Sequence, residues 1–254
     1  MVLLVLTLAG CGAAVAHRPA AHAPQPEASS TAGTVATAPR EPRSVLVRHT
    51  RARATRSRVK PTPRFRYEAL ELTPGLRRQL ERTSWHPGCP VALGQLRYLR
   101  IGYWGFDRRA HLGEMVVNAS AIGGLRRAFA ALFAAKFPIR QMRLVDRYGG
   151  SDYASIQADN TSAFNCRDAT GTSRFSEHAY GLAIDINPIE NPYVYANGTT
   201  THPASDPYLD RANVRPGMAV RGGTLVRAFA AIGWGWGGRW PLPTDFQHFS
   251  VNGR

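Results

Sequence analysis

The sequence predicts an α+β fold: a single compact domain with a small antiparallel sheet flanked by helices. Helical and strand patterns follow one another without the regular alternation that builds a parallel sheet. From about Tyr67 the composition becomes that of a globular protein, so residues 67–254 are expected to form the domain. A chain of that length can bury one sizeable core.

Three segments predict helices, at 73–83, 120–137 and 224–232. The first has Thr73 as a suitable N-cap and Pro74 at its first turn. The longest, 120–137, carries apolar residues at spacings of three and four, which fall on one helix face: Ile122, Leu125, Phe129, Leu132, Phe133 and Phe137.

Three further segments predict strands. Alternating apolar residues indicate one strand within 93–106, and 113–120 forms a second apolar stretch. The segment 139–148 is expected to be a third strand, with Met142 and Leu144 on one face.

Residues 12–66 have a different composition. They hold eleven Arg and Lys against two acids, a net of +9 out of the chain's +15, and are rich in Ala, Pro, Ser and Thr. Without a sustained apolar period such a segment cannot offset its chain entropy, so we expect a disordered basic linker. Its charge favours polyanions: nucleic acid, a membrane surface or an anionic wall polymer.

Residues 1–11 are mostly apolar and too short to span a bilayer, which needs about 20 residues. They suit the apolar part of a signal peptide, and Leu8-Ala9-Gly10-Cys11 resembles the lipobox of bacterial lipoproteins. No Lys or Arg precedes the apolar run, which departs from a usual export signal. We expect an exported lipoprotein anchored through Cys11; an apolar N-terminus without that role is the alternative.

With Cys11 lipidated, Cys89 and Cys166 remain as a pair in a compartment that permits disulfides. The alternative is two buried free thiols. A cysteine-based metal site is not expected, because neither residue has a Cys or His partner at a usual ligand spacing.

The stretch SEHAYGLAIDINP, which starts at Ser176, carries the chemistry. Alternation from Leu182 puts Asp185 on the face opposite the apolar residues, and Gly181 allows a bend that brings His178 toward it. A histidine and a carboxylate are two of the three protein ligands of an open zinc site.

The segment WPLPTDFQHFSV supplies a third ligand, His248, and an acid, Asp245, that can act as a general base. From spacing alone, a buried His–Asp hydrogen bond without metal remains the alternative.

Ser176, His178, Gly181, Ala183 and Asp185 match the Ser-x-His-x-x-Gly-x-Ala-x-Asp signature of the VanY-type D-alanyl-D-alanine carboxypeptidases. Further blocks resemble the branch of that family that also includes L-alanyl-D-glutamate peptidases. They run in order over roughly residues 85 to 250: HPGCPVALGQLRYL, YWGFDRRAHLGEMVVN, FPIRQMRLVDRYGGSD, NTSAFNCR and GWGWGGRW…DFQHF.

The resemblance implies a Hedgehog/DD-peptidase-like fold and a Zn²⁺ ion held by His178, Asp185 and His248. It implies Asp245 as the general base, where many members have Glu. The family uses an arginine upstream of the first histidine to stabilise the oxyanion; Arg167 is the first choice and Arg147 the second. Asp152, Ser155, Asn160 and Asn165 are expected to line the substrate groove.

The expected function is therefore zinc-dependent hydrolysis of peptidoglycan stem peptides, foremost as a D-alanyl-D-alanine carboxypeptidase. A peptidoglycan endopeptidase and a non-catalytic wall-binding module are the alternatives. Nucleic acid is not expected as a partner, because the basic segment lacks interleaved aromatic residues and export would separate it from that ligand. We expect a monomer on the extracytoplasmic side of the membrane.

Overall fold

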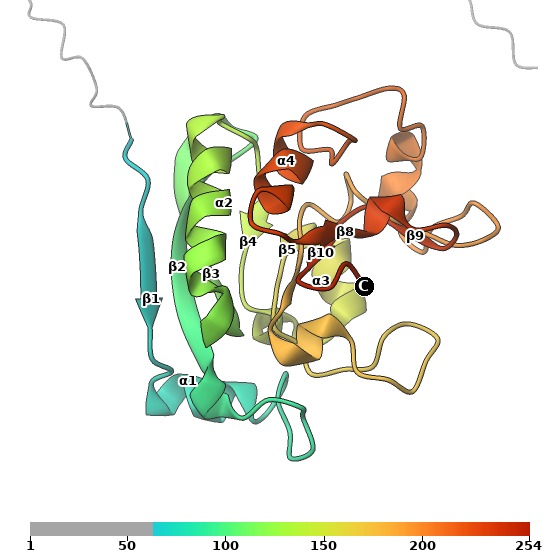
Figure 1. The fold of residues 1–254 in the computed structure, drawn as a ribbon. Helices are drawn as coiled ribbons and strands as arrows, with labels where there is room; N and C mark the ends of the chain where they lie inside the picture. The colour runs from blue at the N-terminus through green and yellow to red at the C-terminus, as the bar shows by residue number, and fades with distance from the viewer. Residues whose placement is uncertain (1–62) are drawn as a thin grey trace, which may run out of the picture. The chain divides into compact units, whose positions relative to one another are not determined.

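Two three-stranded antiparallel sheets, in the orders β1-β2-β3 and β6-β10-β8, organise the described residues, 63–254 (Figure 1). The computed structural model adds two small pairs, parallel β4-β5 and antiparallel β7-β9. The α+β prediction is confirmed, although one pair is parallel. The predicted signal peptide, Cys11 and the linker up to residue 62 lie outside the described residues.

The helices are α1 (Pro74–Leu80), α2 (Ile122–Ala134), α3 (Asp152–Gln157) and α4 (Thr224–Ala230). The strands are β1 (Tyr67–Leu70), β2 (Leu96–Trp104), β3 (Ala110–Asn118), β4 (Gln141–Met142), β5 (Asn160–Thr161), β6 (Ala183–Asp185), β7 (Tyr193–Val194), β8 (Gly235–Trp236), β9 (Thr244–Asp245) and β10 (His248–Ser250). None of the helices among these residues is long and apolar enough to cross a membrane.

The first sheet forms where the sequence alternates. β2 and β3 pair over their whole length, from Leu96 opposite Asn118 to Trp104 opposite Ala110. α2 packs against this sheet, and α4 lies beside α2 (Figure 1). The buried face of α2 contains Leu125, Phe129, Leu132 and Phe133, four of the six residues that its period predicts.

Several elements differ from expectation. The segment 139–148 is not one strand: only Gln141–Met142 is extended, and Val145–Tyr148 forms a 3₁₀ turn. Leu144 and Val145 are both buried because the chain turns between them, whereas a strand would place them on opposite faces. Helix α3 and six short strands were not predicted, because elements of a few residues show too little periodicity in the sequence: β1, β5, β7, β8, β9 and β10.

The core links the helices to the second sheet. Phe129 of α2 meets Phe229 of α4 edge-on at 6.2 Å between ring centroids, and Phe229 stacks on Phe249 of β10 at 4.5 Å. All three side chains are fully buried. Because strand residues alternate in direction, anchoring Phe249 in the core turns its neighbour His248 to the opposite face.

The domain also uses residues just before Tyr67. Phe65 packs on Phe133 with ring centroids 5.6 Å apart, and the Gly102 amide donates to the Arg66 carbonyl at 2.8 Å. These contacts extend the first sheet and its core toward the linker.

Candidate metal centre

Strand pairing brings two of the predicted ligands together. β6 and β10 are antiparallel neighbours, and their register sets His248 directly opposite Asp185. Ile184 and Phe249 are fully buried in the core, so Asp185 and His248 project from the other face of the same sheet. The alternation predicted for 182–186 is confirmed in this respect.

His178 reaches the same point from a 3₁₀ turn, Glu177–Tyr180. The Ser176 hydroxyl accepts from the His178 amide at 3.3 Å and so begins the turn. Gly181 ends it with φ 68°, and a Cβ there would lie 2.6 Å from the Asn118 nitrogen. Both the conformation and the close approach require glycine.

Three side chains converge at this point. His178 Nε2 lies 3.1 Å from Asp185 Oδ2, His248 Nδ1 lies 3.2 Å from Asp185 Oδ1, and the two ring nitrogens are 3.2 Å apart. All three residues are at most 5% exposed. Four tetrahedral ligands about 2.0–2.1 Å from a zinc ion would stand roughly 3.3 Å from one another. The spacing therefore fits zinc.

The remaining ring nitrogens are held by main-chain oxygens. His178 Nδ1 lies 2.6 Å from the Ala163 carbonyl oxygen, and His248 Nε2 lies 2.9 Å from the Arg254 main-chain oxygen. Each of these nitrogens donates its proton to the main-chain oxygen beside it. The other nitrogen of each ring is then unprotonated and carries a lone pair. Outer partners of this kind fix the tautomer of metal-binding histidines.

Two lone pairs that face each other at 3.2 Å repel unless a positive charge lies between them. For the protein groups alone, that charge is a proton. Burial would lower the pKa of His248, but the hydrogen bond to Asp185 and the charges of Asp185 and Asp245 outweigh it and raise it to about 9. Burial would likewise raise the pKa of Asp185, but the His178 and His248 partners hold it well below its usual range. A divalent cation can take the place of this proton.

Asp245 lies beside the cluster in β9 and is 9% exposed. Burial, followed by the charge of Asp185, raises the pKa of its carboxyl to about 7. Its Oδ1 is buried and has no hydrogen-bond partner among the described residues. A carboxyl whose pKa is near neutrality, with one free oxygen, can both accept and return a proton.

Arg167 lies in the groove that contains His178, Asp245 and His248, whereas Arg147 does not. The Nη2 of Arg167 pairs with Asp152 Oδ2 at 3.0 Å, and its Nε is buried without a partner among the described residues. The structure therefore supports the first choice of arginine and separates the second from the site.

The groove has a volume of about 1070 Å³ and is walled by two loops, residues 167–177 and 240–245. The expected contacts from 152–165 are wrong. Ser155, Asn160 and Asn165 are buried and bond within the protein, and Asp152 serves Arg167. Polar residues in that segment stabilise irregular backbone, which the sequence pattern did not distinguish from substrate contacts.

Sequence reasoning also missed backbone contributions to the site. The Ala163 carbonyl that holds His178 is a main-chain group, so no pattern of side chains could reveal it. Trp240 also lies near His248, and the centroids of the two rings are 5.5 Å apart.

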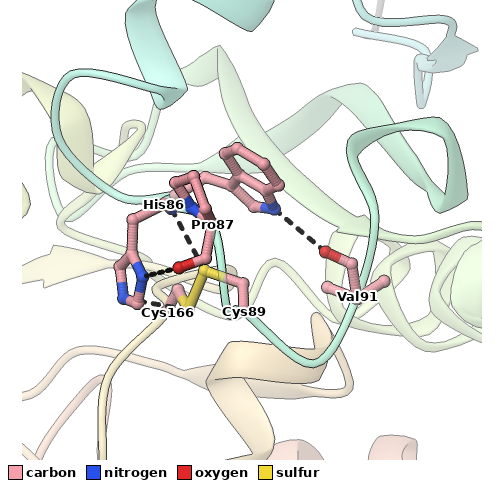
Figure 2. The surroundings of a disulfide bond; sticks show 6 residues. His86, Pro87, Cys89, Val91 and Cys166 are labelled. Atoms are coloured by element: carbon pink, nitrogen blue, oxygen red, sulfur yellow. Dashed lines mark hydrogen bonds between the residues drawn. A yellow bond between two sulfur atoms is a disulfide. The ribbon is translucent and has the colours of Figure 1, made fainter.

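The predicted Cys89–Cys166 disulfide is present, and Figure 2 shows its surroundings. The His86 side chain lies against it, with Nε2 3.5 Å from Cys166 Sγ. His86 and the two cysteines thus form a second cluster of ligand-type residues that the sequence did not predict, but their sulfurs are bonded to each other.

One comparison with known proteins bears on the family. Residues 170–251 match the sequence model of a family described as D-alanyl-D-alanine carboxypeptidase. The resemblance to the VanY-type family is confirmed. The matched stretch contains His178, Asp185, Asp245 and His248, whereas Arg167 and both disulfide cysteines lie outside it. No curated protein and no solved structure matches the chain.

Proposed function

We propose that this chain is a zinc-dependent peptidase of peptidoglycan stem peptides, acting as a D-alanyl-D-alanine carboxypeptidase. The observation that carries the proposal is the convergence of His178 Nε2, His248 Nδ1 and the Asp185 carboxylate, with both distal ring nitrogens bound to main-chain oxygens. The match of residues 170–251 to a carboxypeptidase family supports the reaction class.

His178, Asp185 and His248 would hold the ion, which supplies Lewis-acid activation of water and of the scissile carbonyl. Asp245 takes the proton of the attacking water on its free Oδ1 and returns it to the leaving amine. Arg167 offers its unpartnered Nε–H to the negative charge that develops on the carbonyl oxygen.

The groove walls suit an extended peptide. Phe175 and Leu242 expose apolar surface on the two loops that line the groove, and Arg174 supplies positive charge for a substrate carboxylate. A stem peptide has both apolar alanine methyls and free carboxylates. An endopeptidase acting on L-alanyl-D-glutamate or on a cross-link would use the same residues, so the bond that is cut must be measured.

The cellular setting remains the one that the N-terminal sequence predicts. In this proposal lipid on Cys11 anchors the chain on the extracytoplasmic side, and the basic linker extends the domain, as a monomer, toward an anionic wall. Release of a Cys11→Ser variant from the membrane fraction would support the anchor; unchanged partitioning would contradict it.

The function is tested by incubating the full chain with a defined muropeptide pentapeptide, with and without a chelator, and weighing the products. Loss of one alanine that stops with chelator supports the carboxypeptidase. An internal cut that stops with chelator moves the activity to the endopeptidases. No cut, with zinc bound, contradicts catalysis and favours the wall-binding module.

A further inference from the structure

We propose that the Cys89–Cys166 disulfide is a positioning element of the site: it holds the backbone segment 162–167 that orients His178, Asp185 and Arg167. The inference rests on the proposed function. It concerns residues outside the stretch that matches the carboxypeptidase family, since that stretch begins at residue 170.

The segment 162–167 contacts two of the proposed metal ligands, Asp185 and His178, through its backbone. Ser162 and Asp185 exchange two main-chain hydrogen bonds, at 3.1 and 2.9 Å. The Ala163 carbonyl accepts from the His178 ring, and the Asn165 amide donates to the His178 carbonyl at 3.2 Å. One short piece of chain thus fixes two of the three proposed ligands.

The far end of the segment starts the turn that carries His178. The Arg167 carbonyl accepts from the Ser176 amide at 3.0 Å, and the Ser176 hydroxyl caps the turn by accepting from the His178 amide. Movement of Arg167 would therefore displace both its own guanidinium and the origin of the His178 turn.

The disulfide joins this segment to a loop that is itself anchored. The Cys166 amide donates to the Ser84 carbonyl at 2.9 Å, next to the crosslink. Asp146 Oδ1 accepts from the hydroxyls of Thr83 and Ser84. The crosslink therefore ties residues 162–167 to the 3₁₀ turn Val145–Tyr148 through a fixed loop.

The loop is also closed on itself, as Figure 2 shows. Trp85 Nε1 donates to the Val91 carbonyl at 2.9 Å, and the His86 amide donates to Cys89 Sγ at 3.1 Å. A disulfide to a flexible loop could not hold a residue in place. Because this loop is held by its own hydrogen bonds, the disulfide restrains Cys166 and its neighbour Arg167.

The hydrogen bonds named above for 162–167 use no sulfur atom, so we expect loss of the crosslink to loosen the site rather than abolish it. Changes to the outer partners of metal ligands cost about 10- to 100-fold in metal affinity. We expect the lower end, about 10-fold weaker zinc binding, together with a fall in kcat that exceeds any rise in KM.

The test compares the full chain with its Cys89→Ser/Cys166→Ser double variant. The readouts are zinc affinity by competition with a chromophoric chelator, kcat and KM on the pentapeptide, and amide hydrogen exchange at Ser176 and Gly181 in metal-free protein. Leu132→Ala is the matched control, because it removes buried apolar surface in α2, away from the site, and leaves the disulfide intact.

Faster exchange at Ser176 and Gly181 with weaker zinc binding in the double variant, but not in Leu132→Ala, supports the proposal. Unchanged exchange and affinity would overturn it, as would equal losses in Leu132→Ala. If wild type binds zinc and cleaves nothing, the proposed function fails. The hydrogen-exchange and zinc-affinity measurements still decide whether the disulfide positions the site.

Should the double variant fail to fold, a phosphine reductant applied to folded wild type replaces it. The phosphine gives two electrons to the S–S bond and takes oxygen from water as phosphine oxide, and the two protons of the water form the thiols. Recovery of slow exchange on reoxidation supports the proposal; exchange that does not respond to reduction overturns it.

Discussion

The first and second sheets of this domain differ in the side chains that surround them. β2 and β3 are nine-residue strands that bury Leu99, Ile101 and Met115 against α2. The second sheet is built from strands of two or three residues, and its surroundings bury polar side chains such as Asn187, Asn191 and Gln247.

The stability of the fold and the precise placement of individual side chains therefore come from different interactions. Apolar burial is non-directional, so the first sheet stabilises the fold without fixing any one atom. Hydrogen bonds are directional, and around the second sheet they set the positions of individual side chains. Asn191, for example, donates to the carbonyls of Ile186 and Gly217 and accepts from the Ala219 amide.

The largest effect is expected at Asp245. Asp245→Asn should lower kcat about 10³-fold, because the amide cannot accept the proton of the attacking water. Zinc content and thermal stability should stay close to those of wild type. The exposed Asp168→Asn is the matched control; a variant at Asp245 with more than half the wild-type rate would assign the base elsewhere.

Arg167→Ala should lower kcat about 10²-fold through loss of a donor to the oxyanion. Arg147→Ala is the control, because that side chain lies outside the groove. Steady-state kinetics of the two variants decide between them. Equal losses would mean that the effect is not local to the site.

Phe129→Ala should lower stability through the shared apolar core without removing any group of the site. Removing this fully buried ring should lower the free energy of unfolding by about 3–5 kcal/mol, as measured by denaturant titration. The folded fraction should still bind zinc with wild-type stoichiometry. Loss of zinc from folded protein would show that the two regions are not separable in this way.

The last effect is a pH dependence near the second sheet. Burial, followed by the charge of Asp159, raises the pKa of Glu190 to about 8. The folded state keeps this proton above the unfolded pKa, near 4.5, so the free energy of unfolding falls as pH rises from there to about 8.

Glu190→Gln cannot titrate, so its unfolding free energy should lack this part of the fall. Denaturant titrations between pH 5 and 8 would show the difference, with the exposed Glu81→Gln as control. Parallel pH profiles for wild type and Glu190→Gln would contradict the assignment.

The sequence predicts these regions to different depths. The helix at 120–137 and the strand around Leu99 could be predicted, because buried apolar residues recur along each at the spacing of its secondary structure. His178, Asp185 and His248 were predicted from sequence motifs, and the structure brings them together. Chain turns such as the one at Leu144 depend on contacts with distant residues, and local pattern misplaced them.

The main-chain groups that hold the site residues could not be predicted from the sequence. Ala163, Arg254 and Ser162 act through main-chain atoms that every residue possesses, so their identity gives no signal. Asn160 and Asn165 show the opposite error: polar side chains that suggested substrate contacts instead satisfy buried backbone.

The central claim is that His178, Asp185 and His248 form one zinc site, and elemental analysis of the purified full chain tests it most directly. The account predicts one zinc per chain in wild type and in Asp245→Asn, and loss of that zinc in His178→Ala and His248→Ala while circular dichroism shows both variants folded. Zinc that stays in the histidine variants, or its absence from wild type supplied with the metal at neutral pH, would contradict it.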